Sequence, residues 1–152
     1  MASQTPAGAN QPRALVCVDD ATRQATAMEA LEALGYLGEV GETPAGVIDS
    51  LRKVSYEVIV LDQAWAGATP LDNPLLAAIQ SMPMPVRRYI FVALLGQHLK
   101  TLDHMMAFAK SVNLVVGYGD LREFTALLTG AIGDNDQFYR VFRQVLQEAG
   151  KR

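Results

Sequence analysis

The chain has 152 residues, of which 50% are hydrophobic and 19% charged, enough for one domain with a hydrophobic core. A formal net charge of −3 and a pI near 5.3 exclude the strongly basic surface that binds nucleic acid or anionic membranes. The sequence has no secretory signal and no apolar stretch that could span a bilayer, and its single cysteine, Cys17, precludes an intrachain disulfide. We therefore expect a cytoplasmic protein in which Cys17, within an apolar run, is buried.

Residues 1–12 are small and polar, which predicts a flexible N-terminal tail. From Arg13 onward, two patterns alternate along the chain. Short apolar runs predict strands at 14–18, 37–42, 56–61, 87–95 and 113–118. Amphipathic stretches predict helices at 21–36, 44–54, 74–82, 98–112 and 120–132, the last with Asp120 as its N-cap. This strand–helix order predicts an α/β fold with a parallel sheet and helices on both faces.

Residues 133–152 form a C-terminal extension to the domain predicted at 13–132. Within it, 134–152 is amphipathic and predicts one further helix, with Phe138, Phe142 and Val145 on one face. This face is too apolar to stay bare in water. It either folds back on the domain or binds another protein or a second copy of the chain.

Three acids follow predicted strands. Asp19 and Asp20 come after the first strand, and Asp62 comes directly after the third. Sites in parallel α/β sheets lie at the carboxyl ends of the strands, so the three carboxylates are expected to converge there. Such a set suits Mg²⁺, and with a bound cation Asp62 could attack a phosphoryl group. The alternative is structural: Asp62 caps a loop, and Asp19 or Asp20 caps the following helix.

The segments "ALVCVDD" (14–20) and "YEVIVLD" (56–62) resemble the receiver domain of bacterial response regulators, and the resemblance covers residues 13–132. It implies a flavodoxin-like, CheY-like fold: a doubly wound five-stranded parallel sheet with strand order 2-1-3-4-5, here with an extra C-terminal helix. It also implies that Asp62 is the phosphoacceptor.

The same resemblance implies a metal site. Asp19, Asp20 and Asp62, with the main-chain carbonyl of Ala64, match the residues that bind Mg²⁺ in the family. Mg²⁺ is the only cofactor implied.

The sequence departs from the family at the positions that switch conformation. The Thr or Ser expected at the end of the fourth strand is Ala93 or Leu94, and the Lys expected at the end of the fifth strand is Gly117. Leu114 replaces an aromatic switch residue, and Tyr118 stands where Pro commonly follows the Lys. A switch needs contacts that differ between two states, and several of the usual contacts are missing. The pattern is typical of an atypical receiver, or pseudo-receiver.

We therefore predict a non-enzymatic signalling module that acts through protein–protein contacts. The alternative is a conventional two-component receiver, phosphorylated on Asp62 with Mg²⁺; an enzyme of related fold would need a general acid that no motif provides. The expected partners are proteins, such as a histidine kinase or an output or scaffold protein, with a homodimer as a further alternative. The candidate partner surface comprises Met105, Met106, Phe108, Tyr118, Phe138 and Phe142, for which core packing is the competing explanation.

Overall fold

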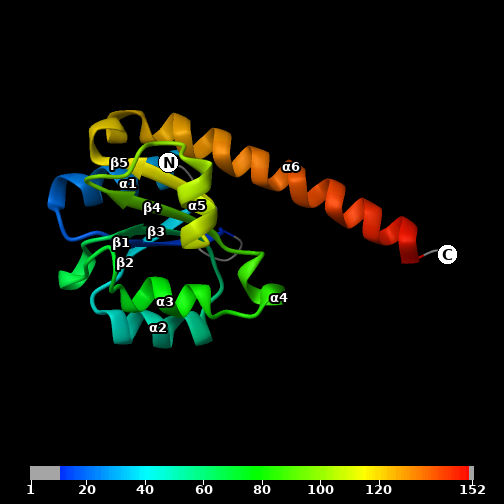
Figure 1. Cartoon of the computed structure of the whole chain (residues 1–152), viewed down its shortest axis with the longest axis horizontal. Helices are drawn as coiled ribbons and strands as arrows, with labels where there is room; N and C mark the ends of the chain where they lie inside the picture. The colour runs from blue at the N-terminus through cyan, green and yellow to red at the C-terminus, as the bar shows by residue number, and fades with distance from the viewer. Residues whose placement is uncertain (1–10, 151–152) are drawn as a thin grey trace.

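A computed structural model describes residues 11–150 (Figure 1). Its centre is a five-stranded, wholly parallel sheet with the order β2-β1-β3-β4-β5, which confirms the predicted topology. The strands are β1 (Arg13–Cys17), β2 (Leu37–Val40), β3 (Tyr56–Asp62), β4 (Phe91–Gly96) and β5 (Leu114–Gly117). Of the tail predicted at 1–12, all but the last two residues lie outside the described part of the chain.

Helices cover both faces of the sheet. They are α1 (Ala21–Ala33), α2 (Pro44–Lys53), α3 (Pro74–Gln80), α4 (Met84–Arg87), α5 (His104–Lys110) and α6 (Phe124–Gly150), with two 3₁₀ turns, η1 (Trp65–Gly67) and η2 (Tyr118–Glu123). Apolar residues of α1 and α6 pack on one face, and those of α2, α3 and α5 pack on the other. No helix among residues 11–150 is both long and apolar enough to cross a membrane.

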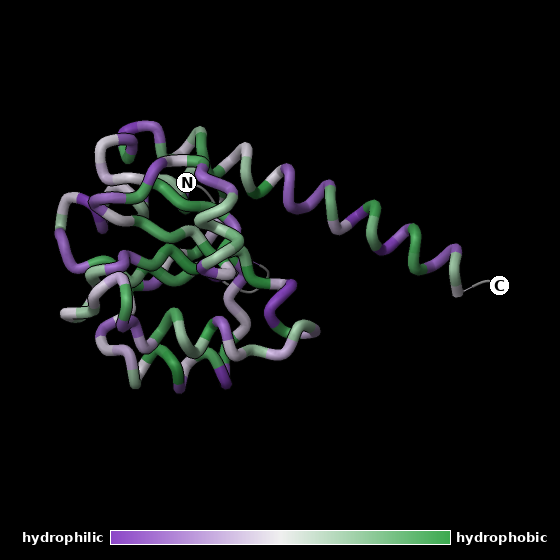
Figure 2. The backbone as a smooth tube through the Cα atoms, in the orientation of Figure 1, coloured by the Kyte–Doolittle hydropathy of each residue, from purple (hydrophilic) through white to green (hydrophobic). Residues whose placement is uncertain are grey.

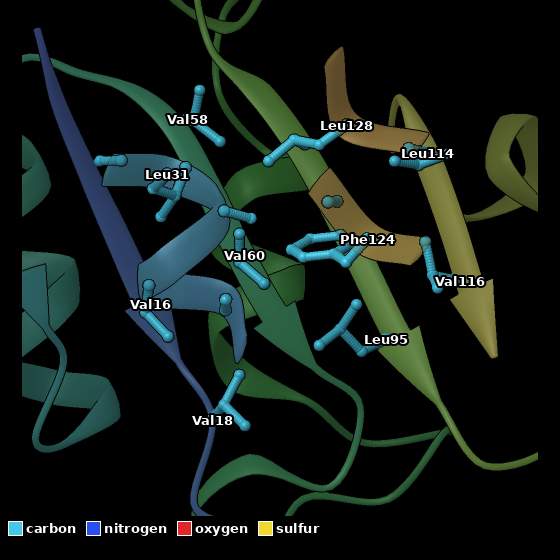
Figure 3. Packing of buried hydrophobic residues seen from close by; sticks show 14 of the residues in the cluster. Val16, Val18, Leu31, Val58, Val60, Leu95, Leu114, Val116, Phe124 and Leu128 are labelled. Atoms are coloured by element: carbon cyan, nitrogen blue, oxygen red, sulfur yellow. The ribbon is translucent and has the colours of Figure 1, made fainter. Parts of the chain in front are cut away.

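The first core layer fixes the beginning of α6. Phe124 and Leu128 are fully buried and lie over Val60, Leu95 and Val116 of the sheet, beside Leu31 of α1 (Figure 3). Alternating strand residues point to the two faces, so both layers consist of aliphatic side chains. Cys17 is fully buried in the opposite layer, as predicted.

Two predicted helices differ from the structure. The helix expected at 98–112 begins only at His104, because Asp103 accepts a hydrogen bond from the Met106 amide and caps it there. The preceding residues bind β5 instead: the Leu102 amide donates to the carbonyl of Val115 at 3.0 Å.

The helices predicted at 120–132 and 134–152 are one continuous helix, α6. Asp120 is therefore not its N-cap but lies in η2. Gly133, which lies between the two predicted helices, is exposed within α6, and a Cβ added to it would have no neighbour within 4 Å. The extra C-terminal helix exists as the extension of the last helix of the domain.

The segment after α3 also differs. The strand predicted at 87–95 begins at Phe91, because residues 84–87 form the short helix α4. A proline at the start of a helix loses no hydrogen bond, so Pro85 is accommodated in the first turn of α4.

Candidate functional site

The three acids lie at the carboxyl end of the sheet. Asp20 is the N-cap of α1, and its Oδ1 accepts a hydrogen bond of 2.9 Å from the Arg23 amide. Asp19 Oδ2 accepts 2.8 Å from the Ala66 amide and so ties the loop after β1 to the loop after β3. Ala66 has a left-handed backbone with φ 56°, which the Asp19 contact stabilises. The helix-capping role considered for Asp19 or Asp20 is therefore present, and Asp20 performs it.

Asp62 is the buried member of the group, with 3% of its surface exposed. Its Oδ1 accepts two hydrogen bonds, one from the Ala64 amide at 2.9 Å and one from the hydroxyl of Tyr118 at 2.6 Å. Hydrogen bonds to a carboxylate are stronger than neutral ones, so this oxygen is firmly held.

Arg23 supplies the positive charge. Its Nε lies 3.6 Å from Asp62 Oδ2, and one terminal nitrogen lies 3.9 Å from Asp20 Oδ2. The guanidinium carbon is 3.8 Å from the centre of the Tyr118 ring, a cation–π stack. The Nε is buried and has no hydrogen-bond partner, so its contact with Asp62 is electrostatic. Arg23, Tyr118 and Asp62 thus form one interlocked group, here called the Asp62 triad.

The environment of Tyr118 keeps its hydroxyl protonated. Burial, the hydrogen bond to Asp62 and the charge of that carboxylate raise the Tyr118 pKa to about 12, although the Arg23 charge opposes the rise. The hydroxyl is therefore a donor to Asp62 throughout the neutral range.

Comparison with solved structures decides the fold. CheY4, the chemotaxis response regulator of Vibrio cholerae, superposes with a TM-score of 0.63 at 12% identity, covering 80% of this chain and 99% of its own. The HemR receiver domain of Leptospira biflexa superposes with a TM-score of 0.61 at 20% identity, covering 80% of this chain and 94% of its own. A CheY-like receiver domain protein of Methanospirillum hungatei superposes with a TM-score of 0.62 at 10% identity, covering 84% of this chain and 98% of its own.

The fold is that of a response-regulator receiver domain. The agreement lies in the structure rather than the sequence, since no family model and no curated protein sequence matches the chain. The superpositions establish the receiver fold. At sequence identities this low, the chemistry of the site has to be argued from its own residues.

The three acids predicted to bind a metal are not grouped as a metal site. In this conformation, no three acidic, histidine or cysteine side chains among residues 11–150 are grouped to hold a metal ion. Asp19 and Asp20 are engaged with backbone amides, and the Arg23 cation lies next to both Asp20 and Asp62. The residues therefore do not fit Mg²⁺ as they lie. Assignment of Asp19, Asp20, Asp62 and the Ala64 carbonyl as metal ligands stays a prediction that requires Arg23 to move.

The switch half of the receiver site is closed by apolar packing. β4 extends to Gly96, so Ala93 and Leu94 lie inside the strand, fully buried on opposite faces, and Leu95 pairs with Asp62. Neither Leu95 nor Gly96 supplies the hydroxyl that receivers place at this strand end.

The end of β5 leaves no room for the receiver lysine. A Cβ on Gly117 would lie 2.5 Å from the carbonyl oxygen of Leu99, and the Gly117 amide donates to Thr101 Oγ1 at 2.9 Å. Leu114, at the start of the strand, is buried in the core. The segment 97–103 thus occupies the space beside the strand end.

The residues of the predicted partner surface separate into two groups. Met105, Phe108 and Phe138 are exposed, at 77%, 83% and 62%, whereas Met106 and Phe142 are half-buried. Tyr118 is half-buried and belongs to the Asp62 triad.

The role of Tyr118 in this triad was not predicted from the sequence, and Arg23 was not predicted as a site residue at all. The available signal was an arginine in the first helical turn after the acid pair, together with a phenol next to the missing lysine.

Proposed function

We propose that this chain is a receiver-like signalling module that acts by binding other proteins and does not use the usual phosphorylation switch. The observation that supports it best is the Asp62 triad. A receiver needs a free carboxylate oxygen as nucleophile. Here Oδ1 accepts two hydrogen bonds, and the Arg23 cation lies beside Oδ2.

Absence of the switch contacts supports the same proposal. Phosphorylation shifts a conformational equilibrium only as far as the phosphoryl group makes different contacts in the two states. Ala93, Leu94, Leu95 and Gly96 offer no hydroxyl, and Gly117 offers no cation. A phosphoryl group on Asp62 would therefore have little influence on β4 or β5. We infer no enzymatic activity: the protonated group beside Asp62 is the Tyr118 hydroxyl, and its hydrogen bond is already made to the Asp62 carboxylate.

One observation favours the alternative, a conventional receiver phosphorylated on Asp62 with Mg²⁺. Arg23 places a cation near Asp62, and guanidinium groups bind phosphoryl oxygens well. If the Tyr118 and Arg23 side chains swing aside together, Asp62 and the Oδ2 atom of Asp20 would be free to face a metal. The alternative therefore predicts that a phosphoryl mimic and Mg²⁺ act together on the site.

Candidate partners are proteins, such as a histidine kinase or an output or scaffold protein. Met105 and Phe108 project from α5 with most of their surface exposed, and Lys110 follows on the same helix. Exposed flexible and aromatic side chains suit a protein interface. We propose α5 as the first surface to test for a partner.

Trp65 offers a direct test. It is the only tryptophan, lies in η1 three residues after Asp62, and is 2% exposed. We would titrate Mg²⁺ and then beryllofluoride, a phosphoryl mimic, and follow Trp65 fluorescence. No saturable change with both reagents together is expected. A saturable change that needs both, is lost in Asp62→Asn and persists in the exposed control Asp49→Asn would establish the conventional receiver instead.

A further inference from the structure

The second half of α6 leaves the body of the protein. This helix has 27 residues, which makes it about 40 Å long. Its first turns pack on the sheet through Phe124 and Leu128, but its last turns project away from the domain (Figure 1). We call residues 138–150 the arm.

The residues that anchor α6 belong to a repeating pattern that continues along the arm. Successive residues of this pattern are alternately four and three positions apart, without interruption, as are the a and d positions of a heptad repeat. The residues are Phe124, Leu128, Ala131, Asn135, Phe138, Phe142, Val145 and Ala149. We call this row the seam. It predicts that the arm, like the root of the helix, packs against something along this face.

The body covers the root of the seam completely and the arm only in part. Phe124 and Leu128 are fully buried, Asn135 is half-buried and receives a long hydrogen bond from Asn113, and Phe142 touches the body through Arg88. Phe138 is 62% exposed and Val145 57%. Green apolar turns alternate with purple polar turns out to the end of the arm (Figure 2).

An uncovered arm of this composition is unfavourable. Helical segments this short are marginal in water without tertiary packing. Val141 and Leu146 flank the seam with 49% and 53% of their surfaces exposed, which widens the apolar stripe. A stripe of this width is typical of a helix face that is buried against other apolar residues.

We propose that the arm pairs with the arm of a second copy of this chain in an antiparallel helical pair. The seam is the argument for a second copy: it is continuous with the core-packing face and carries no charged residue, so the same surface on another molecule is complementary to it. The proposal concerns a surface remote from Asp62 and does not depend on the proposed function.

The direction of pairing follows from the position of the body. The domain covers the seam over the first half of α6, whereas over the second half Phe138 and Val145 are exposed and only Phe142 is half-buried. A parallel pair would place the root of the other helix against the same side, where the sheet already lies. An antiparallel pair overlaps only the two arms, so the root of each α6 and the sheet beneath it stay clear of the other helix.

The antiparallel register also matches side-chain sizes. Opposed a and d positions place Phe138 across from Ala149 of the second copy, and Phe142 across from Val145, so each aromatic ring meets a smaller residue. The tip of each arm then reaches the cleft of about 380 Å³ beneath the other α6. Arg88, Tyr89 and Tyr139 line this cleft, and Tyr89 is 65% exposed.

The first test is the mass of the full chain in solution, measured by light scattering during gel filtration over a dilution series. We expect a dimer that dissociates on dilution. Val145→Glu should raise the dissociation constant by roughly 100-fold, since it places a charge in the seam of both copies. Gln147→Glu adds the same charge outside the seam and should change the dissociation constant of the dimer by no more than about threefold.

A monomer at every concentration would overturn the proposal, as would a dimer that Val145→Glu leaves intact. Circular dichroism would show that Val145→Glu keeps the native sheet, which is expected because Val145 lies outside the body.

The antiparallel direction of the two arms is tested by disulfide trapping. Phe138→Cys in one tagged chain and Ala149→Cys in another should form a mixed disulfide, whereas Ala149→Cys alone should not crosslink to itself. Two Ala149 positions are about 16 Å apart along an antiparallel pair and adjacent in a parallel one. Self-crosslinking of Ala149→Cys without the mixed product would overturn the antiparallel arrangement. Native Cys17 is buried and takes no part.

Discussion

The hydroxyl of Tyr118 donates a 2.6 Å hydrogen bond to Oδ1 of Asp62, across 56 residues of sequence. It joins the first residue after β5 to the last residue of β3. In the family that the sequence resembles, a lysine at the end of the fifth strand approaches this aspartate. Here a neutral phenol takes that place, and the positive charge comes from Arg23 of α1, which stacks on the phenol ring.

The Asp62 triad should behave as one energetic unit. Tyr118→Phe removes a hydrogen bond to a charged group and should lower the free energy of unfolding by about 1–2 kcal/mol. Arg23→Met removes the charge and keeps much of the contact with the ring, at a cost of about 1 kcal/mol. Denaturant unfolding of both single variants and the double variant should give a coupling of at least about 0.5 kcal/mol.

Asp62→Asn provides the control for that coupling. Asparagine keeps an oxygen that accepts from Tyr118 and the Ala64 amide but carries no charge. Arg23→Met should therefore cost less in this background than in the wild type. Strict additivity of Tyr118→Phe and Arg23→Met would mean that the two residues act separately on Asp62.

Tyr118 should also leave a signature at alkaline pH. Its pKa rises from 10.0 to about 12 on folding. Between these values the unfolded chain has lost the phenolic proton while the folded chain still holds it, so stability falls as the pH rises from 10 to 12. Unfolding measured across this range should show a shallower fall in Tyr118→Phe than in the wild type.

The comparison between variants is needed because burial also raises the pKa of Tyr36 and Tyr56. Tyr89→Phe, at an exposed phenol, controls for the removal of a tyrosine as such. An identical pH dependence in Tyr118→Phe and the wild type would contradict the hydrogen bond to Asp62.

Cys17 should be inert in the native protein. Burial and the nearby Asp19 charge raise the pKa of its thiol to about 12, so at pH 8 only about one molecule in ten thousand carries the thiolate. Labelling by a thiol reagent should be slow in buffer and fast in denaturant. Ser55→Cys, at an exposed loop position, gives the rate of an accessible thiol. Fast native labelling of Cys17 would show that β1 opens readily.

The sequence was sufficient for the sheet but not for the contacts at its edge. Apolar runs placed all five strands and the acids after them, because strand burial depends on local composition. The role of Tyr118 depends on a contact between residues 56 positions apart, which no local pattern encodes. Arg23 was overlooked because an arginine in a first helical turn is ordinarily a solvated residue.

The errors at helix ends have a similar cause. The sequence pattern predicted two helices, at 120–132 and 134–152, yet the seam on either side of Gly133 keeps a single helical phase. Leu99 to Asp103 have helical composition, but tertiary hydrogen bonds to β5 determine their conformation. Propensity is a weak guide where such contacts compete with it.

Placing a lysine at position 117, where receivers have one, should not restore a response to phosphorylation. In Gly117→Lys, the new Cβ would lie 2.5 Å from the Leu99 carbonyl oxygen, a backbone atom that cannot rotate away. The segment 97–103 would have to shift, so the variant should lose about 1–3 kcal/mol of stability. Its Trp65 fluorescence should still not respond to beryllofluoride with Mg²⁺, because the hydroxyl on β4 is also missing.

Gly119→Lys is the matched control for Gly117→Lys. It adds the same side chain two residues further on, where a Cβ has no neighbour within 4 Å, and should change stability by no more than about 0.5 kcal/mol. Thermal unfolding of both variants compares a closed position with an open one. If Gly117→Lys were as stable as Gly119→Lys and gained a saturable beryllofluoride response, the missing lysine would be the only obstacle to phosphorylation, and the site would be a conventional receiver lacking one residue.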